Sequence, residues 1–319
     1  MYNEERKQSY IDSKSRTYSS IQMRKSVFKQ TEKYEIEFNK DICEFNNSEI
    51  TILLNNMFGI RSRSRTWSLT ILKDYIRWCI ISNIPNTNQS LLSAQTIGSD
   101  KIKETMVSCP THLQKCLDIL FDKEDEDTVD CIYRCYCWMA FSGISEDDVL
   151  KVKSNDIDFI RQNIIVNGKN YPLYRDGIKS FINASRLTEF IYKNAAYSKK
   201  ITVNRVPGDE LIRGIRAVPS LQTIRTEISR TNKNAIDAGK EKNIVKLSYY
   251  RLWLSGIFYR EYDNERSGYN VDFEKYAKEF VSGKTYKLDS CRSSIDNKSR
   301  QIYNEYLNDY ECWKAAFFI

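Results

Sequence analysis

The chain has 319 residues, and its 49 lysines and arginines exceed its 42 aspartates and glutamates, giving a formal net charge of +7. This length suffices for two domains with a large core, and the basic excess is compatible with binding a polyanion without requiring it. Nine cysteines, no recognisable signal peptide and no apolar run long enough to cross a bilayer argue against a membrane protein and predict a reducing cytoplasm. Only 5 prolines and 11 glycines favour a largely helical fold.

Residues 1–86 show three helical segments. Apolar residues recur at roughly helical spacing from Arg6 to Glu37. A second helix is expected to begin near Ser48, a typical N-cap, and a third to run from Trp67 to Ser82. The pattern predicts a helical domain over residues 1–86 and a polar linker over residues 87–108.

Three alternate arginines, Arg61, Arg63 and Arg65, form a basic loop just before the third predicted helix. Together with the free amides of the helix N-terminus, they could bind several phosphates. A solvated basic loop without a ligand would have the same sequence, so this alternative stays open.

The predicted second domain, residues 109–319, begins with a helix up to Phe121 for which Thr111 is a plausible N-cap. The only histidine, His112, lies near several cysteines, but the spacings match no zinc module, which needs about four ligands. Cysteines on buried helices are commonly small apolar residues. No glycine-rich phosphate loop is present either, so we expect neither a metal nor a small-molecule cofactor.

The segment that follows is the most informative part of the chain. Residues Cys131 to Phe141 are too densely apolar for a surface helix and predict a buried one, which Gly143 ends. Ser145 and three acidic residues after it predict the start of another helix that ends near Asn155. Two short apolar runs on either side of Asn167-Gly168 then predict a β-hairpin with a type I′ turn.

Three helical segments are predicted in the rest of the chain. A helix is expected from Gly177 to Asn194, and Lys199 to Val203 with Arg205 is typical of a strand or a basic loop. A long helix from Pro219 to Ala238 combines an apolar side with a polar side, and an apolar helix follows it. Polar side chains of this kind hydrogen-bond base edges and phosphates, although an ordinary solvated face would look the same. The candidate DNA-contacting residues on this face are Gln222, Thr223, Arg225, Thr226 and Arg230.

This order of elements resembles the catalytic domain of the tyrosine recombinases, or phage integrases, and the first helices resemble their SAM-like core-binding domain. In that family a turn reads Gly-Leu-Arg, an acid follows it, a hairpin presents a lysine, and a later box reads His-x-x-Arg. The resemblance implies a mainly α fold with a small β-hairpin or sheet, in which a core-binding domain precedes a catalytic-type domain. It aligns these motifs with Gly143-Ile144-Ser145, Asp148, Lys169 and Ser248 to Arg251.

The departures from the family pattern matter more than the matches. Ser145 replaces the first catalytic arginine and Ser248 replaces the histidine. A serine offers neither the rigid guanidinium fork that clamps a phosphate nor a proton-transfer group. Arg251 and Lys169 would still attract a phosphate, unless Arg251 is a buried structural arginine. Nothing selects a nucleophile among Tyr286, Tyr303, Tyr306 and Tyr310, so the expectation is a recombinase frame without catalytic residues.

An eroded site of this kind, with the runs Arg65-Thr66, Tyr75 to Cys79 and Ser142 to Glu146, is similar to the master-repressor family of SPβ-like prophages. That resemblance implies a sequence-specific transcriptional repressor that maintains lysogeny in the cytoplasm of a bacterial host. Its partner would be operator DNA, with self-association on DNA or a phage-encoded regulator as further partners. Two alternatives remain: an active recombinase that cuts and rejoins DNA through a tyrosine, and an interaction protein that binds no DNA.

Overall fold

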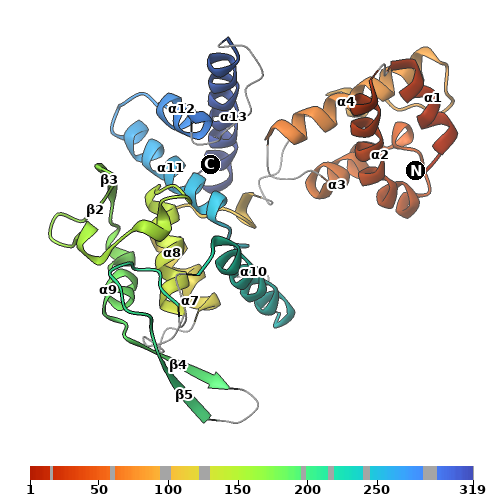
Figure 1. Ribbon diagram of the computed structural model, residues 1–319. Coiled ribbons are helices and arrows are strands. Elements are labelled where there is room, and N and C mark those ends of the chain that lie inside the picture. The colour runs from red at the N-terminus through yellow and green to blue at the C-terminus, as the bar shows by residue number, and fades with distance from the viewer. Residues whose placement is uncertain are drawn as a thin grey trace. The chain divides into compact units, whose positions relative to one another are not determined.

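The structure is a computed structural model that is mainly helical with two small antiparallel sheets, as the sequence predicts (Figure 1). Its contacts divide the chain into two units, Met1–Ile102 with Phe273–Ile319, and Lys103–Asp272. This division groups the last segment with the first helices, which differs from the predicted 109–319 domain, and the boundaries at residues 86 and 108 stay a prediction. The described residues are 1–14, 17–57, 62–93, 102–121, 130–194, 199–214, 219–239, 245–282 and 293–318.

Among the described residues, five helices form the amino-terminal part of the first unit. Their rings pack edge to edge, with the centroid of Tyr10 at 5.9 Å from that of Phe28 and 5.2 Å from that of Tyr75. Beneath these rings the ammonium of Lys7 donates to Glu35 at 2.5 Å, and both side chains are fully buried. The helices are α1 (Glu4–Lys14), α2 (Tyr18–Phe38), α3 (Asn47–Met57), α4 (Ser62–Ile81) and α5 (Ser90–Ser93), with a 3-10 turn, η1, over Ile42–Glu44.

Three sequence predictions for these helices need correction. The helix expected from Arg6 to Glu37 is two helices, because Thr17 caps α2 by accepting from the amide of Ser20. The N-cap of α3 is Asn46 and not Ser48, since Asn46 and Glu49 accept from each other's backbone amides at 3.0 and 2.9 Å. The predicted basic loop is helical from Ser62 onward.

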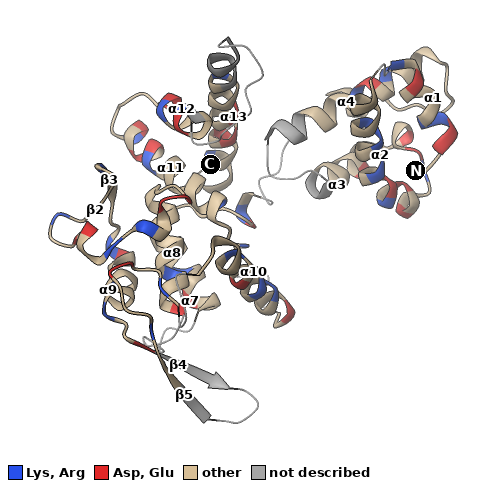
Figure 2. Cartoon of the chain, viewed as in Figure 1, with Lys and Arg blue, Asp and Glu red and all other residues tan. Residues whose placement is uncertain are grey.

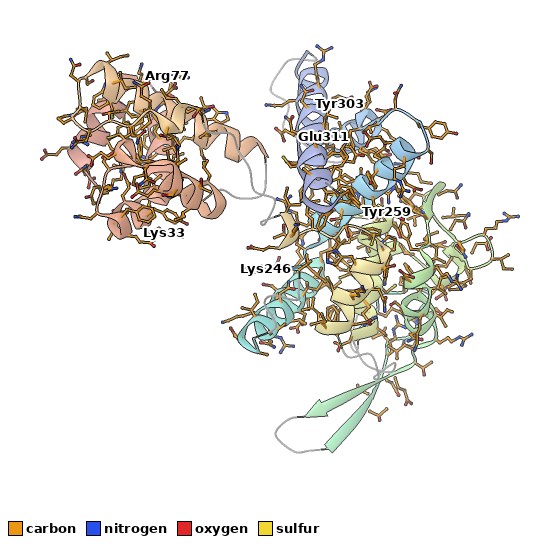
Figure 3. The ribbon with its side chains drawn as sticks, turned by 180° about the vertical axis from the view of Figure 1, so that it is seen from behind. Lys33, Arg77, Lys246, Tyr259, Tyr303 and Glu311 are labelled. Atoms are coloured by element: carbon orange, nitrogen blue, oxygen red, sulfur yellow. The ribbon has the colours of Figure 1, made fainter. Side chains whose placement is uncertain are left out.

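Two further helices, α12 (Glu274–Ser282) and α13 (Ser293–Phe318), complete the first unit. Tyr306 and Tyr310 on α13 are buried, and their rings lie 6.3 and 5.5 Å from that of Phe273. Tyr303, on the same helix, is partly exposed (Figure 3). Tyr286 lies outside the described residues.

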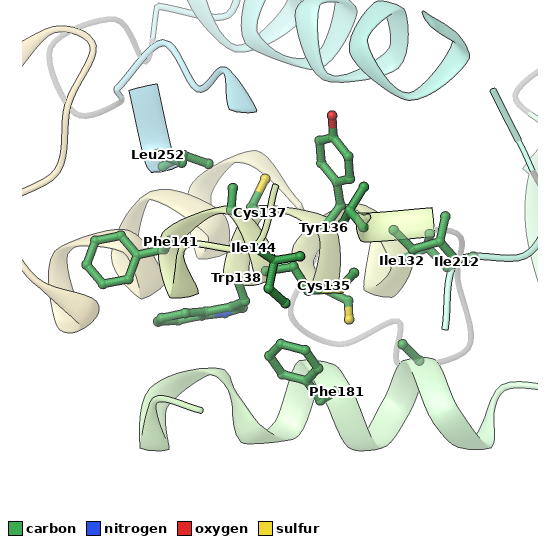
Figure 4. Close-up of a cluster of buried hydrophobic side chains, with 14 of the residues drawn as sticks. Ile132, Cys135, Tyr136, Cys137, Trp138, Phe141, Ile144, Phe181, Ile212 and Leu252 are labelled. Carbon is green, nitrogen blue, oxygen red and sulfur yellow. The ribbon is translucent and has the colours of Figure 1, made fainter. Parts of the chain in front are cut away.

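The second unit is built around α8 (Asp130–Ser142), whose side chains from Cys135 to Ser142 are all buried, which confirms the predicted buried helix. In Figure 4 Phe181 of α9 (Ile178–Arg186) points toward α8 beside Trp138. The opposite side of α8 packs against α11 (Tyr249–Arg266). At this contact Gly256 lies so near α8 that an added Cβ would meet the carbonyl oxygen of Phe141 at 1.8 Å.

Two more helices are described in this unit, α7 (Pro110–Leu120) and α10 (Leu221–Asp237). The N-cap of α7 is Cys109 and not Thr111, whose hydroxyl instead donates to Asp176 at 2.9 Å. The end of the predicted linker also packs in this unit, because Val107 is buried and its amide donates to Ser255 Oγ at 3.2 Å.

The predicted hairpin is confirmed. Strands β2 (Asn163–Val166) and β3 (Lys169–Pro172) pair antiparallel with Val166 opposite Lys169, and β1 (Ile157–Asp158) adds a third strand. Asn167 and Gly168 have φ angles of +51° and +75°, as a type I′ turn requires.

Two predicted helices are wrong. The one after Gly143 is only two 3-10 turns, η2 (Val149–Lys151) and η3 (Ser154–Asp156), because the amide of Ser154 bonds to the carbonyl of Asp209 and not to its own helix. The helix expected to reach Asn194 ends at Arg186, and its last part pairs as β4 (Glu189–Asn194) with β5 (Lys199–Asn204). A third turn, η4, covers Arg175–Gly177.

Candidate functional site

The turn after α8 is held by side chains of α11. Gly143, with φ +96°, and Ile144 close the helix by donating to Ala140 and Met139 at 2.9 and 3.2 Å, the pattern of a Schellman motif. The carbonyls of the turn then accept from α11: Trp253 Nε1 donates to Gly143 at 3.0 Å, and the hydroxyl of Tyr249 donates to Ile144 at 2.9 Å. The position of Ser145, the next residue, is therefore fixed relative to the start of α11. The two α11 side chains that anchor the turn are Trp253 and Tyr249.

Ser145 joins the turn to the hairpin through Asp148. Its hydroxyl donates to Asp148 Oδ2 at 2.7 Å, and the other carboxylate oxygen accepts from Lys151 and from Asn167, both at 2.9 Å. Burial raises the pKa of Asp148, but the hydrogen bonds from Lys151, Ser145 and Asn167 outweigh it, so the pKa lies below its ordinary value. Lys169 begins β3 two residues after Asn167 and is exposed. The structure thus places Ser145 and Asp148, two of the sequence-predicted site positions, next to the turn of the predicted hairpin.

The second pair of family positions lies at the start of α11. Ser248 is the N-cap, and its carbonyl accepts from the amide of Leu252 at 3.0 Å, while its side chain makes no capping hydrogen bond. Arg251 lies in the first turn and is only 9% exposed, with its guanidinium carbon 5.7 Å from the ring centre of Tyr250. This burial favours the structural reading of Arg251 that the sequence left open, and its contact with DNA stays a prediction.

Helix α10 carries the predicted DNA-contacting face. Ser220 caps it by accepting from the amide of Thr223 at 3.1 Å. Its buried side contains Ile224, Ile228 and Asn232, so the residues between them face solvent. Gln222, Thr223, Arg225, Thr226 and Arg230 are all exposed. Charges of both signs lie along α10 (Figure 2), and Arg230 pairs with Glu227 on the same helix at 2.6 Å.

A contact that the sequence did not reveal ties α10 to the turn. Arg225 donates from Nε and Nη2 to the two carboxylate oxygens of Glu146, at 2.7 and 2.5 Å, and the hydroxyl of Tyr136 donates to the same carboxylate at 2.7 Å. Burial raises the pKa of Glu146, but the hydrogen bonds from Arg225 and Tyr136 outweigh it, so its pKa is lowered. The hydrogen bond from Arg225 to Glu146 raises the pKa of the guanidinium. No local signal could have found this pair, because 79 residues separate its members.

The turn, α10 and the start of α11 line a pocket of about 430 Å³ that is open to solvent. Asn232 holds two of its walls together, because it donates to the carbonyl of Leu247 at 2.9 Å and accepts from the amide of Leu247 at 3.3 Å. Among the described residues that line the pocket, Arg225 is the only cation, and Glu146 neutralises it. The lining residues are Tyr136, Glu146, Arg225, Ile228, Ser229, Asn232, Leu247, Ser248, Tyr249 and Tyr250.

The other predicted site residues are not among those that line this pocket, or they lie outside the described residues. Arg61 is outside the described residues, while Arg63 and Arg65 belong to the first turn of α4 in the other unit. Within the described ranges, no group of three or more histidine, cysteine and acidic side chains is arranged to hold a metal ion. The helices in those ranges include none with the length and hydropathy needed to cross a bilayer.

The molecule is thus a two-unit, mainly helical protein with a pocket at the start of α11. Residues 1–81 match the family model of the MrpR N-terminal core-binding domain. Among solved structures, the crystal structure of XerA recombinase is similar at a TM-score of 0.37 and 13% sequence identity, over 96% of this chain and 99% of that one. A likeness at that TM-score carries no argument about function. No curated protein matches the chain.

Proposed function

We propose that this protein is a sequence-specific DNA-binding repressor that does not cut DNA. The observation that carries the proposal is the match of residues 1–81 to a core-binding domain. The exposed polar face of α10 supports it, because Gln222, Thr223 and Thr226 there offer amide and hydroxyl groups of the kind that read base edges. A formal net charge of +7 favours the approach of a polyanion.

The chemistry of the pocket supports binding without cleavage. Strand cleavage by a tyrosine needs cations on the scissile phosphate and an acid or base for the leaving hydroxyl. At the two positions where the family has an arginine and a histidine, this chain has Ser145, whose hydroxyl donates to Asp148, and Ser248, which occupies the N-cap position of α11 without a side-chain capping hydrogen bond. The loss of each electrostatic donor is worth about 10²–10³ in rate, and the losses compound.

Such a protein would repress by occupying its operator. The resemblance to the master-repressor family of SPβ-like prophages gives the biological setting, the maintenance of lysogeny in a bacterial host. In that setting the partner is double-stranded operator DNA, and further regulation would come from self-association on DNA or from a phage-encoded regulator.

Footprinting followed by gel shifts tests the proposal. We expect the purified chain to protect a discrete site on host or prophage fragments, and to bind that site at least 10³-fold more tightly than unrelated duplex at the same salt, about the lower limit for specific binders. Gln222→Ala with Thr226→Ala should reduce this ratio, whereas Asn264→Ala, an exposed amide on α11, should not. Equal affinity for both duplexes would remove the claim of specificity.

One observation favours the alternative of an active recombinase. The guanidinium of Arg225 pairs with the carboxylate of Glu146, the residue after Ser145, and Arg225 lines the same pocket as Ser248. If the pair with Glu146 opened, this guanidinium could take the place of the missing arginine. That function predicts a covalent protein–DNA adduct on a nicked suicide substrate, lost on a single Tyr→Phe change such as Tyr303→Phe. Such an adduct would overturn the repressor proposal. If the chain showed no salt-dependent DNA binding at all, the third possibility, an interaction protein without DNA, would replace both.

A further inference from the structure

The Glu146–Arg225 pair stands out because it connects the proposed DNA-contacting helix to the rigid core of its unit. Glu146 is held on both sides, by the two nitrogens of Arg225 and by the hydroxyl of Tyr136. Tyr136 belongs to the fully buried part of α8, and its ring centre lies 4.7 Å from that of Tyr249, with the two rings tilted by 53°. The carboxylate therefore has a fixed position. Its lowered pKa keeps it ionised at neutral pH.

Arg225 lies among the residues proposed to contact DNA. On a helix, side chains three and four positions apart share a face, so Gln222, Arg225 and Thr226 are neighbours on α10. The Arg225 side chain is 51% exposed and that of Glu146 24% exposed. A duplex placed on this face would thus meet an arginine whose Nε and Nη2 already donate to a carboxylate.

We propose that Glu146 is a specificity-determining residue: it withholds the charge of Arg225 from DNA phosphates unless the duplex fits the α10 face. This inference rests on the proposed function and deepens it. Non-specific binding depends on the number of phosphates that free cations neutralise. A bidentate arginine–carboxylate pair is a strong, directional contact, so a loosely placed phosphate competes poorly with Glu146, whereas a phosphate held in register by base contacts competes well.

The experiment measures binding of the full chain to a mixed-sequence duplex and to its footprinted site as a function of salt. Glu146→Gln keeps the shape and the hydrogen bond to Tyr136 but removes the charge that retains Arg225. We expect it to bind the mixed-sequence duplex several-fold more tightly, with a salt slope steeper by about 0.9, the value for one added phosphate contact. The ratio of specific to non-specific affinity should fall.

Two further variants separate the masking of Arg225 from a general loss of negative charge. In an Arg225→Gln background, Glu146→Gln should have no further effect on the salt slope. Glu227→Gln changes the net charge equally but frees an arginine from an exposed pair within α10, and its effect should be smaller. The inference is overturned if Glu146→Gln leaves the slope unchanged, or if its gain persists without Arg225. A wild-type chain that binds neither duplex would instead refute the proposed function.

Discussion

The contact between α8 and α11 positions both halves of the candidate site, and Gly256→Ala tests it directly. An ideal Cβ at this position would lie 1.8 Å from the carbonyl oxygen of Phe141 and 2.6 Å from its carbonyl carbon. These are backbone atoms of a buried helix, so no rotamer change can relieve the overlap and the two helices must separate. Overpacking of a core costs about 1–3 kcal/mol and occasionally more, while replacing glycine by alanine in a helix returns about 1 kcal/mol. Because a 1.8 Å approach to backbone atoms belongs at the upper end of that cost, we expect a net loss of about 2 kcal/mol.

Urea unfolding followed by tryptophan fluorescence and circular dichroism measures this loss. With a slope of about 1–3 kcal/mol per molar urea, a loss of about 2 kcal/mol should lower the midpoint by roughly 0.7–2 M. Asp263→Ala, at an exposed position of the same helix, is the control and should change stability by less than about 0.5 kcal/mol. A Gly256→Ala chain as stable as the wild type would mean that α8 and α11 do not meet at this glycine.

Three more predictions concern buried or paired carboxylates. Glu35→Gln leaves the buried ammonium of Lys7 without its counter-ion and should cost about 3–5 kcal/mol in thermal or urea unfolding. Because the folded-state pKa of Glu146 is lowered, ionised Glu146 contributes fully to stability above the ordinary pKa of 4.5, and this contribution is lost as the pH falls through the lower folded-state pKa. In a series of melting temperatures measured in acid, Glu146→Gln should therefore lose less stability with falling pH than the wild type. Asp148→Ala removes the acceptor for Ser145, Lys151 and Asn167, and hydrogen exchange should become faster in the β2–β3 hairpin, with a global loss of about 1 kcal/mol.

The parts of this fold that follow from local sequence were predictable. The Asn167-Gly168 turn needs two positive φ angles, which these residue types supply, so the hairpin could be read directly. The buried helix α8 was equally clear, because apolar residues cover it on all sides.

Where pairing with distant segments decides the structure, the local pattern misled. The apolar residues of β4 have a spacing that suits a helix. They nevertheless form a strand that pairs with β5, and the spacing within β4 alone does not reveal this partner. Arg205 looked like part of a basic strand or loop, yet it is buried and donates to the carbonyls of Ala184, Leu187 and Leu211. Its guanidinium is therefore part of the core of this unit.

The site shows the same limit in its electrostatics. The sequence identified the serines at positions 145 and 248 as departures from a catalytic pattern and Asp148 as the acid of that pattern, but not the side chains that pair with Glu146 and Asp148. Glu146 and Asp148 both have lowered pKa values, so two anions persist next to Ser145 at neutral pH. A scissile phosphate at that point would meet paired arginine and ionised acid, where catalysis needs uncompensated positive charge. In the proposed function, contact with DNA would therefore come from exposed cations and polar groups such as those of α10, and Glu146 would set how much of the charge on Arg225 reaches the duplex.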